Sequence, residues 1–284
     1  MGRGVAVVTD STCDLPADLV ERLGIRVVPL SVTFGDETLI SGVTISNEAF
    51  YDRLAATSRL PTTSQPAPAW FEEAYADCVD DGHDAVVSLH VSAALSGTVD
   101  LARHRAGRAG LPVEVVDTQL VGGALGLAAL RAHRVAEAGG TVAEVVEVAE
   151  AVRDRSLSLL VVDDLSHLKR GGRLTGAQAA VGSVLRVKPV LQVVEGRVEV
   201  RERTRTWQRA LDRVAEMAVE HAAGREVDVV VAHAVAAERA ASLWSRLEGR
   251  LEVGERLETH MGPIVGAHVG PGAVGIAVVP RADA

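Results

Sequence analysis

The sequence of 284 residues contains few aromatic residues, few cysteines and few lysines. Aromatic side chains make up 3% of the chain, and lysine occurs only at positions 169 and 188, so arginine supplies nearly all of the positive charge. The two cysteines, Cys13 and Cys78, lie far apart and fit neither a disulfide framework nor a metal-binding spacing. We therefore expect two reduced, small side chains and neither a metal nor a cofactor.

Long hydrophobic runs and a signal sequence are also missing. No apolar stretch is long enough to predict a membrane-spanning helix, and residues 1–30 lack the charged and apolar regions of a signal peptide. The net charge of −9 argues against nucleic-acid binding and against a polybasic membrane patch. With 48% hydrophobic and 24% charged residues, the chain has a globular composition. The expectation is a compact cytoplasmic protein.

The first half of the chain alternates between strand and helix patterns. A Thr141–Glu144 capping box precedes a run of apolar residues at helical spacing. Strands are predicted at residues 5–8, 25–32, 84–89 and 113–116, with helices starting near Pro16, Pro68 and Thr141. Strands that alternate with helices predict a parallel sheet with helices packed on it.

The pattern changes near residue 156. A strand is predicted at 157–162, followed by a hairpin of residues 190–194 and 197–201 around Glu195-Gly196. A helix with Trp207, Leu211 and Val214 on one face and strands at 227–232 and 274–279 complete this half. The predicted fold class is therefore α/β with two domains. Residues 1–155 form an N-terminal domain with a parallel sheet, residues 156–284 form a C-terminal domain with a mixed sheet, and a ligand site lies between them.

Four segments combine hydroxyl groups, glycines or a histidine in ways that suggest a binding site: residues 61–68, 92–98, 169–173 and 266–272. Each has a structural alternative. Thr63 could turn or cap the chain before the helix at Pro68, Ser96 or Gly97 could start a helix, and the Gly-Gly pair at 171–172 could form a plain turn. His268 lies among glycines, which allow backbone or ligand to come close, and this favours a functional role.

Enzyme signatures are weak by comparison. The sequence has no nucleophile elbow, phosphate-binding loop or zinc-protease motif, and His83, Asp84 and His90 do not have metal-ligand spacing. Asp10 and Asp14 follow the first strand, where turn and cap roles are expected more often than catalysis. The hydroxyls, one imidazole and backbone N–H groups form a set of donors without a base to activate a nucleophile. Such a set suits an anion better than it suits attack on an ester.

Seven motifs, in order along the chain, resemble the DegV family of bacterial fatty-acid-binding proteins, also called FakB. The motifs are V-V-T-D-S-T at 7–12, T-S-Q-P at 63–66, L-S-G-T at 95–98, V-D-T at 116–118, K-x-G-G-R at 169–173, V-K-P at 187–189 and A-H-x-G-x-G at 267–272. The resemblance covers essentially the whole chain. It implies a parallel N-terminal sheet and a mixed C-terminal sheet with a long-chain fatty acid bound between them. It also implies a partner, an ATP-dependent fatty acid kinase that converts the presented carboxylate into acyl phosphate for phospholipid synthesis.

The resemblance also implies roles for individual residues. Thr63 and Ser96 match the hydroxyls that hold the carboxylate, and His268 matches the histidine that joins them. Ser64, Gly97 and Thr98 match loop positions that support these groups. Arg173 and Arg205 match positively charged positions at the mouth of the fatty-acid site or on the surface that docks the kinase. The expected protein is a carrier without catalytic residues, monomeric and in transient contact with membrane surfaces at most. Two alternatives stay open: an enzyme, either a hydrolase or a phosphoryl-transfer subunit, that uses the same hydroxyls, and a lipid-sensing regulator.

Overall fold

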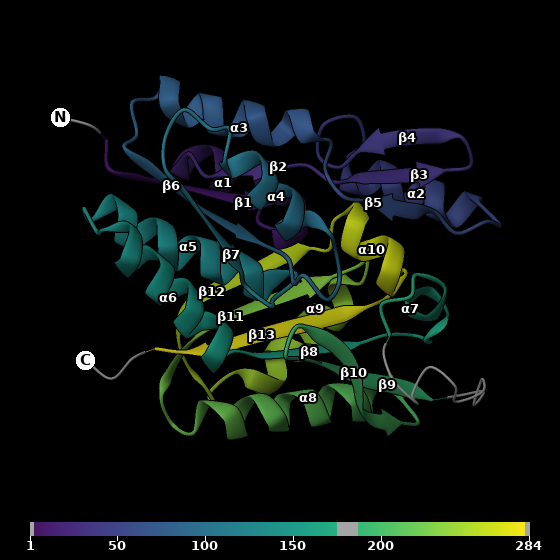
Figure 1. The fold of residues 1–284 in the computed structure, drawn as a ribbon. Helices are drawn as coiled ribbons and strands as arrows, with labels where there is room; N and C mark the ends of the chain where they lie inside the picture. The colour runs from purple at the N-terminus through teal and green to yellow at the C-terminus, as the bar shows by residue number, and fades with distance from the viewer. Residues whose placement is uncertain (1–2, 175–186, 282–284) are drawn as a thin grey trace.

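The computed structural model describes residues 3–174 and 187–281. A four-stranded sheet from the first half of the chain faces a six-stranded sheet from the second half, and a small third sheet lies at one end (Figure 1). The α/β class and the two kinds of large sheet predicted from the sequence are both confirmed. The domain boundary at residue 155 stays a prediction.

The four-stranded sheet has the order β2-β1-β6-β7, and all of its strand pairs are parallel. Its strands are β1 (Val5–Asp10), β2 (Arg26–Val28), β6 (Ala85–His90) and β7 (Val113–Asp117). The surrounding helices are the short η1 (Ser11–Cys13), α1 (Ala17–Leu23), α3 (Pro68–Asp80) and α4 (Thr98–Ala106). Helix α1 ends at Gly24, whose φ of 68° is the left-handed conformation that glycine adopts without strain. Both cysteines are buried and unpaired, as expected.

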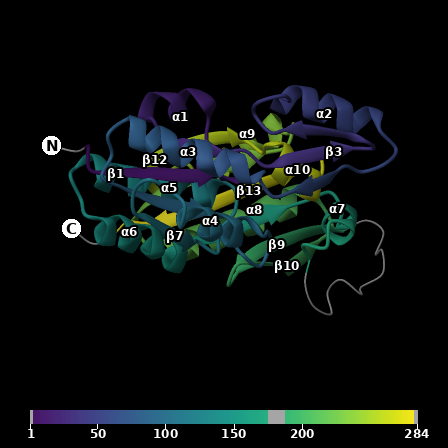
Figure 2. The ribbon, with the colours of Figure 1, turned by 45° about the horizontal axis from the view of Figure 1, so that its top comes forward.

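The prediction of one continuous strand over residues 25–32 was wrong. The chain forms β2, leaves the parallel sheet at Pro29, and then enters β3 (Ser31–Phe34) of a separate antiparallel sheet. Proline has no N–H to donate to a neighbouring strand, so a ladder ends readily there. The new sheet has the order β4-β3-β5, with β4 (Glu37–Ile40) and β5 (Thr62–Ser64), and is accompanied by α2 (Asn47–Ala56). It lies at the same end of the molecule as helices α7 (Ser166–Arg170) and α10 (Pro263–Val269) (Figure 2).

The six-stranded sheet has the order β10-β9-β8-β13-β11-β12 and is mixed. Its strands are β8 (Leu157–Val161), β9 (Lys188–Val194), β10 (Arg197–Thr204), β11 (Glu226–His233), β12 (Glu252–His260) and β13 (Val274–Pro280). The predicted hairpin is confirmed, because Glu195 and Gly196 both have positive φ between β9 and β10. The helices of this half are α7 (Ser166–Arg170), α8 (Trp207–Ala222), α9 (Ala237–Leu247) and α10 (Pro263–Val269).

Helix α5 (Gly123–Glu137) lies between the two large sheets, with α6 (Val142–Arg155) beside it (Figure 1). Residues 124–130 of α5 are all buried, which is typical of a helix enclosed on every side. Its small residues allow this close packing: a Cβ on Gly123 would lie 2.6 Å from a methyl group of Val230, and a Cβ on Gly126 would lie 2.7 Å from the carbonyl oxygen of Cys13. One core cluster therefore includes side chains from both sheets.

Candidate functional site

Thr63 and His268 lie side by side although 205 residues separate them in the sequence. Thr63 belongs to β5, where pairing with Val32 of β3 fixes its position. His268 lies in the last turn of α10, which packs against the small sheet. The Oγ1 atom of Thr63 is 2.8 Å from Nε2 of His268, a hydrogen-bond distance. The structure therefore brings together two of the three residues predicted to hold a carboxylate.

The imidazole of His268 is neutral at pH 7. Burial lowers its pKa to about 4, and the positive charges of Arg173 and His167 act in the same direction. Its Nδ1 atom is buried without a hydrogen-bond partner among the described residues and faces Gly171, where a Cβ would lie only 2.2 Å away. We therefore assign the single ring proton to Nε2, which donates to Thr63 Oγ1. The hydroxyl hydrogen of Thr63 is then left for a ligand.

Ser96 carries the second hydroxyl of the site. Helix α4 begins at Thr98, and its N-cap, Gly97, has no side-chain cap, so Ser96 does not serve as the helix cap that the sequence allowed. The Oγ atom of Ser96 is instead 2.8 Å from Oγ1 of the fully buried Thr98. A Cβ on Gly97 would lie 2.5 Å from Oε1 of Gln65, so this loop approaches the segment that follows Thr63. A Cβ at this position would have to displace the end of the exposed Gln65 side chain.

Arg173 lies in the wall beside these groups. Its Nε donates to the carbonyl oxygen of Leu95 at 3.0 Å, and its Nη1 donates to that of Gly171 at 2.5 Å. These two bonds place its positive charge next to the loop that carries Ser96. Arg205 is exposed and follows the end of β10. The two arginines that the resemblance grouped together therefore differ, because Arg173 lines the cavity beside these groups and Arg205 does not.

A cavity of about 150 Å³ extends from these polar groups between the two halves of the molecule. That volume is far above the roughly 10–15 Å³ that one water molecule needs. Thr63, Ser64, Ser96, His268 and Arg173 all line it. Most of the other lining side chains are aliphatic, and they include Leu30, Leu95, Val121, Leu160, Leu191, Val193, Val198, Val230, Ala232, Ile264, Val265 and Val269. The cavity therefore has a polar region and a long apolar region.

The floor of the apolar region is one face of the six-stranded sheet. Val230, Ala277 and Ser158 are paired neighbours on β11, β13 and β8, so their side chains point to the same side of the sheet. Helix α5 closes this region, because Gly123 packs directly on Val230. A chain that starts at Thr63 and runs along this floor would be enclosed by both halves of the protein.

Besides Nδ1 of His268, two buried polar atoms of cavity-lining residues have no hydrogen-bond partner among the described residues: Oδ2 of Asp14 and Oγ of Ser158. Sequence reasoning assigned Asp14 to a turn or cap and did not select Ser158. Burial raises the pKa of Asp14 to about 8, so its carboxyl group is protonated at neutral pH. No pattern in the sequence indicates that either side chain faces a cavity, since both orientations depend on how the two halves pack.

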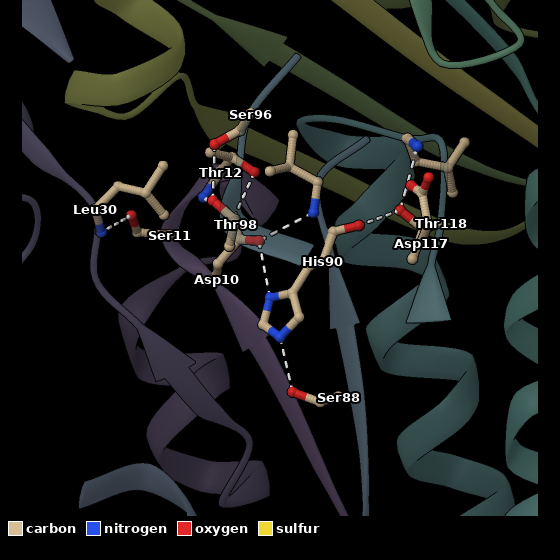
Figure 3. A network of polar contacts seen from close by, with 12 residues as sticks. Asp10, Ser11, Thr12, Leu30, Ser88, His90, Ser96, Thr98, Asp117 and Thr118 are labelled. Atoms are coloured by element: carbon tan, nitrogen blue, oxygen red, sulfur yellow. Dashed lines mark hydrogen bonds and ion pairs between the residues drawn. The ribbon is translucent and has the colours of Figure 1, made fainter. Parts of the chain in front are cut away.

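A chain of hydrogen bonds beneath the site has the same order as a serine hydrolase triad (Figure 3). His90 Nδ1 is 3.0 Å from Asp10 Oδ2, and His90 Nε2 is 2.7 Å from Oγ of Ser88, which also contacts the Tyr75 hydroxyl at 3.0 Å. Burial would raise the pKa of Asp10, but hydrogen bonds and the charge of His90 hold it below the usual value. Ser88, His90 and Asp10 have no exposed surface, so no substrate reaches Ser88. The array also joins the ends of β1 and β6, because the N–H of Val91, which follows β6, donates to Asp10 at the end of β1.

Within residues 3–174 and 187–281, no helix is long and apolar enough to cross a membrane. Within the same ranges, no group of three or more histidine, cysteine or acidic side chains is arranged to hold a metal ion.

Comparison with known proteins gives the same family at the level of sequence and of structure. The family model described as "Uncharacterised protein, DegV family" matches residues 4–281. A DegV domain-containing protein of Streptomyces coelicolor is 45% identical over 99% of this chain and 100% of its own length. Among solved structures, a fatty-acid-binding DegV family protein of Thermus thermophilus matches with a TM-score of 0.91 at 35% identity, covering 98% of this chain and 100% of that chain. DegV of Bacillus subtilis, described as a fatty acid binding protein, matches with a TM-score of 0.88 at 32% identity, covering 98% of this chain and 99% of that chain.

Proposed function

Because this chain belongs to the DegV family, we propose that it binds a long-chain fatty acid and presents the carboxylate to a partner kinase. The observation that carries the proposal is the cavity itself, which is lined by the hydroxyls of Thr63 and Ser96, by the imidazole of His268 and, for the most part, by aliphatic side chains. The Thermus thermophilus and Bacillus subtilis relatives are described as binding fatty acids, which supports the same ligand class for this protein. The protein acts as a carrier in this proposal and catalyses no step itself.

The carboxylate is held by the hydroxyls of Thr63 and Ser96 directly, and by His268 through Thr63. The hydroxyl of Thr63 accepts from His268 Nε2–H, and the hydroxyl of Ser96 pairs with Thr98. Each pair leaves one hydroxyl hydrogen that can turn toward a carboxylate oxygen, and a hydroxyl that already accepts a hydrogen bond is a stronger donor. A buried carboxylate needs several such donors, because an unpaired charge in an apolar site is costly.

The tail provides most of the affinity and the head group fixes the orientation. At about 0.8 kcal/mol per methylene, burial of a chain of roughly 16 carbons contributes on the order of 10 kcal/mol before the costs of binding. Hydrogen bonds to a charged group add about 1.5–3 kcal/mol each. Hydroxyl donors, one of them oriented by the imidazole of His268, hold the carboxylate less tightly than a bidentate arginine would, so an oxygen atom stays available to a kinase.

Extraction of the purified protein tests the ligand directly. Mass spectrometry of the organic extract is expected to show a long-chain fatty acid that is released on denaturation and is retained by the native protein through gel filtration. Titration of delipidated protein with stearate then gives a Kd. Delipidated, folded protein that fails to bind any long-chain fatty acid would exclude the proposal.

The kinase step needs a separate measurement. With an ATP-dependent fatty acid kinase, the loaded protein is expected to yield acyl phosphate, and the protein alone is expected to hydrolyse neither ATP nor an ester. We place Arg173 at the mouth of the cavity and Arg205 on the docking surface, so Arg205→Ala and Arg173→Ala should slow phosphorylation while the fatty acid stays bound. Loss of the lipid from either variant would show that the residue helps to hold the fatty acid itself. The proposed protein is a monomer in the cytoplasm, and it contacts membrane surfaces only briefly.

A further inference from the structure

Asp14 links the two halves of the protein and also faces the apolar part of the cavity. Its Oδ1 accepts a hydrogen bond from the backbone N–H of Gly262 at 2.9 Å, across 248 residues. Its Oδ2 is buried and has no hydrogen-bond partner in the described parts of the chain. The residue as a whole is only 8% exposed. An unpaired polar atom in such a place costs about 1–3 kcal/mol, so it calls for an explanation.

The unpaired oxygen lies on the cavity side of the carboxyl group. A Cβ on Gly122, which lines the cavity, would be 3.7 Å from Oδ2, whereas a Cβ on Gly262 would be 3.2 Å from Oδ1. Burial and the negative charge of Asp10 raise the pKa of Asp14 to about 8 against the effect of the Gly262 N–H. In the neutral acid the proton resides on Oδ2, because Oδ1 is the acceptor for Gly262. The cavity wall therefore presents an O–H donor without an acceptor.

Helix α10 fixes how far this donor lies from the head-group site. The helix lines the cavity with Ile264, Val265 and His268. Gly262 precedes its first residue and His268 lies in its last turn, so the two are separated by about 9 Å at 1.5 Å per residue. A fatty acid whose carboxylate is held at His268 and whose chain follows α10 passes Asp14 in mid-chain, not next to its carboxylate.

We propose that Asp14 donates a hydrogen bond to an oxygen atom carried in mid-chain by the ligand, so that the cavity selects oxygenated long-chain fatty acids, keto or hydroxy acids, over unsubstituted ones. This inference rests on the proposed function, since it assumes that a fatty acid occupies the cavity. It adds a specificity-determining residue and a narrower substrate class. A ketone oxygen only accepts hydrogen bonds and therefore reports on the donor without ambiguity.

The test compares the Kd of stearate with that of a mid-chain ketostearate on the delipidated protein. The wild type is expected to bind the keto acid about three- to tenfold more tightly, the range of one hydrogen bond between neutral groups. Asp14→Leu should abolish this preference, so that stearate and the keto acid bind with equal affinity. Asp18→Leu, which changes an exposed aspartate of α1, is the matched control and should keep the preference. Ser158→Ala removes another unpaired atom of the cavity wall, and loss of the preference in Ser158→Ala but not in Asp14→Leu would overturn the assignment.

A second variant covers the case in which Asp14→Leu does not fold. Asp14→Asn keeps an acceptor for Gly262 and an N–H donor toward the cavity. Raising the pH from about 7 to about 9 should remove the keto preference of the wild type, whose Asp14 ionises, and leave that of Asp14→Asn unchanged. The titratable groups coupled to Asp14 do not interfere, because Asp10 has a lowered pKa while Cys13 and Tyr51 have raised ones.

The outcomes of these binding measurements distinguish the role of Asp14 from the proposed function. Equal affinity of the wild type for stearate and ketostearate would overturn the inference and leave the proposed function intact. An equal pH response of the two proteins would likewise overturn the role of Asp14. Failure of the wild type to bind either acid would overturn both.

Discussion

Thr63 Oγ1 and His268 Nε2 are 2.8 Å apart, and this contact joins the small antiparallel sheet of the first half to α10 of the second half. The head-group site is therefore assembled only when the two halves pack together. Because His268 is neutral, it orients the Thr63 hydroxyl as a hydrogen-bond donor and places no full charge beside a bound carboxylate. The hydroxyl of Thr63 contacts His268, whereas that of Ser96 contacts Thr98, so each hydroxyl can be removed by mutation without removing the other's partner.

Removing the hydroxyls should weaken fatty-acid binding without unfolding the protein. Ser96→Ala and Thr63→Ala each remove one hydrogen bond to a charged group, so each is expected to raise the Kd roughly tenfold or more. Neither hydroxyl caps a helix, so the melting temperature should change little. Thr62→Ala, on the same strand but exposed and outside the cavity lining, is the matched control. A folded double variant with wild-type affinity would show that these residues do not hold the carboxylate.

Acid should destabilise the ligand-free protein through His268. The pKa of this histidine is about 4 in the folded protein and about 6.5 when unfolded, so the unfolded state binds more protons between these values. The stability contributed by the neutral imidazole is complete above pH 6.5 and is lost as the pH falls toward 4, by up to roughly 3 kcal/mol. His268→Gln lacks this contribution, so its free energy of unfolding should fall less between pH 7 and pH 4.5. Chemical denaturation of both proteins at several pH values measures this difference. If the free energy of unfolding had the same pH dependence in the wild type and in His268→Gln, His268 would not be buried and neutral.

Much of the fold follows from local sequence signals. The helix predicted to start near Pro68 is α3, and its buried residues recur at helical spacing: Phe71, Ala74, Tyr75 and Cys78. The capping box at Thr141 is also present. Strand β5 was not predicted, because three residues between prolines show no alternation. Helix α5 was not predicted either, because a helix that is apolar on all sides has no polar face to mark its period.

The site was predictable only in part. The resemblance to known motifs selected Thr63, Ser96 and His268, and the structure places all three in the lining of one cavity. Their role in holding a carboxylate stays a prediction. The unpaired carboxyl oxygen of Asp14 could not be predicted, because its burial depends on Gly262 and Gly122, which come from distant parts of the chain. Polar groups are buried by tertiary packing, and periodicity along one segment does not report it.

The buried serine of the triad-like array is expected to contribute to stability and not to catalysis. Ser88→Ala leaves the Tyr75 hydroxyl and His90 Nε2 without their partner, which should lower the free energy of unfolding by about 1–3 kcal/mol. Chemical denaturation measures this loss. Esterase assays should find no turnover in either the wild type or the variant. A wild-type esterase activity that disappears in Ser88→Ala would instead establish the hydrolase alternative.

Replacement of Asp14 by asparagine should stabilise the ligand-free protein at neutral pH. The folded pKa of about 8 lies well above the usual value of 3.8, so the folded state binds more protons between these values and the free energy of unfolding falls as the pH rises through them. At pH 7 this costs about 4 kcal/mol, which Asp14→Asn avoids while its side-chain oxygen still accepts from Gly262. The difference should shrink toward pH 4. A variant no more stable than the wild type at pH 7 would place the carboxyl group in contact with water.

Gly171→Ala should disturb the head-group site through a purely steric contact. A Cβ at this position would lie 2.2 Å from Nδ1 of His268, so the imidazole must move and its contact with Thr63 is lost. The backbone itself tolerates alanine, because Gly171 has a φ of −70° at the end of α7. Gly107→Ala is the matched control, because Gly107 follows α4 with a φ of −65° and has no neighbouring atom within 4 Å of the added Cβ.

We expect Gly171→Ala to raise the Kd for fatty acid about tenfold, which is the scale of one hydrogen bond to a charged group. Gly107→Ala should leave the Kd unchanged. Equal affinities in the two variants would mean that the position of His268 does not control how the carboxylate is held.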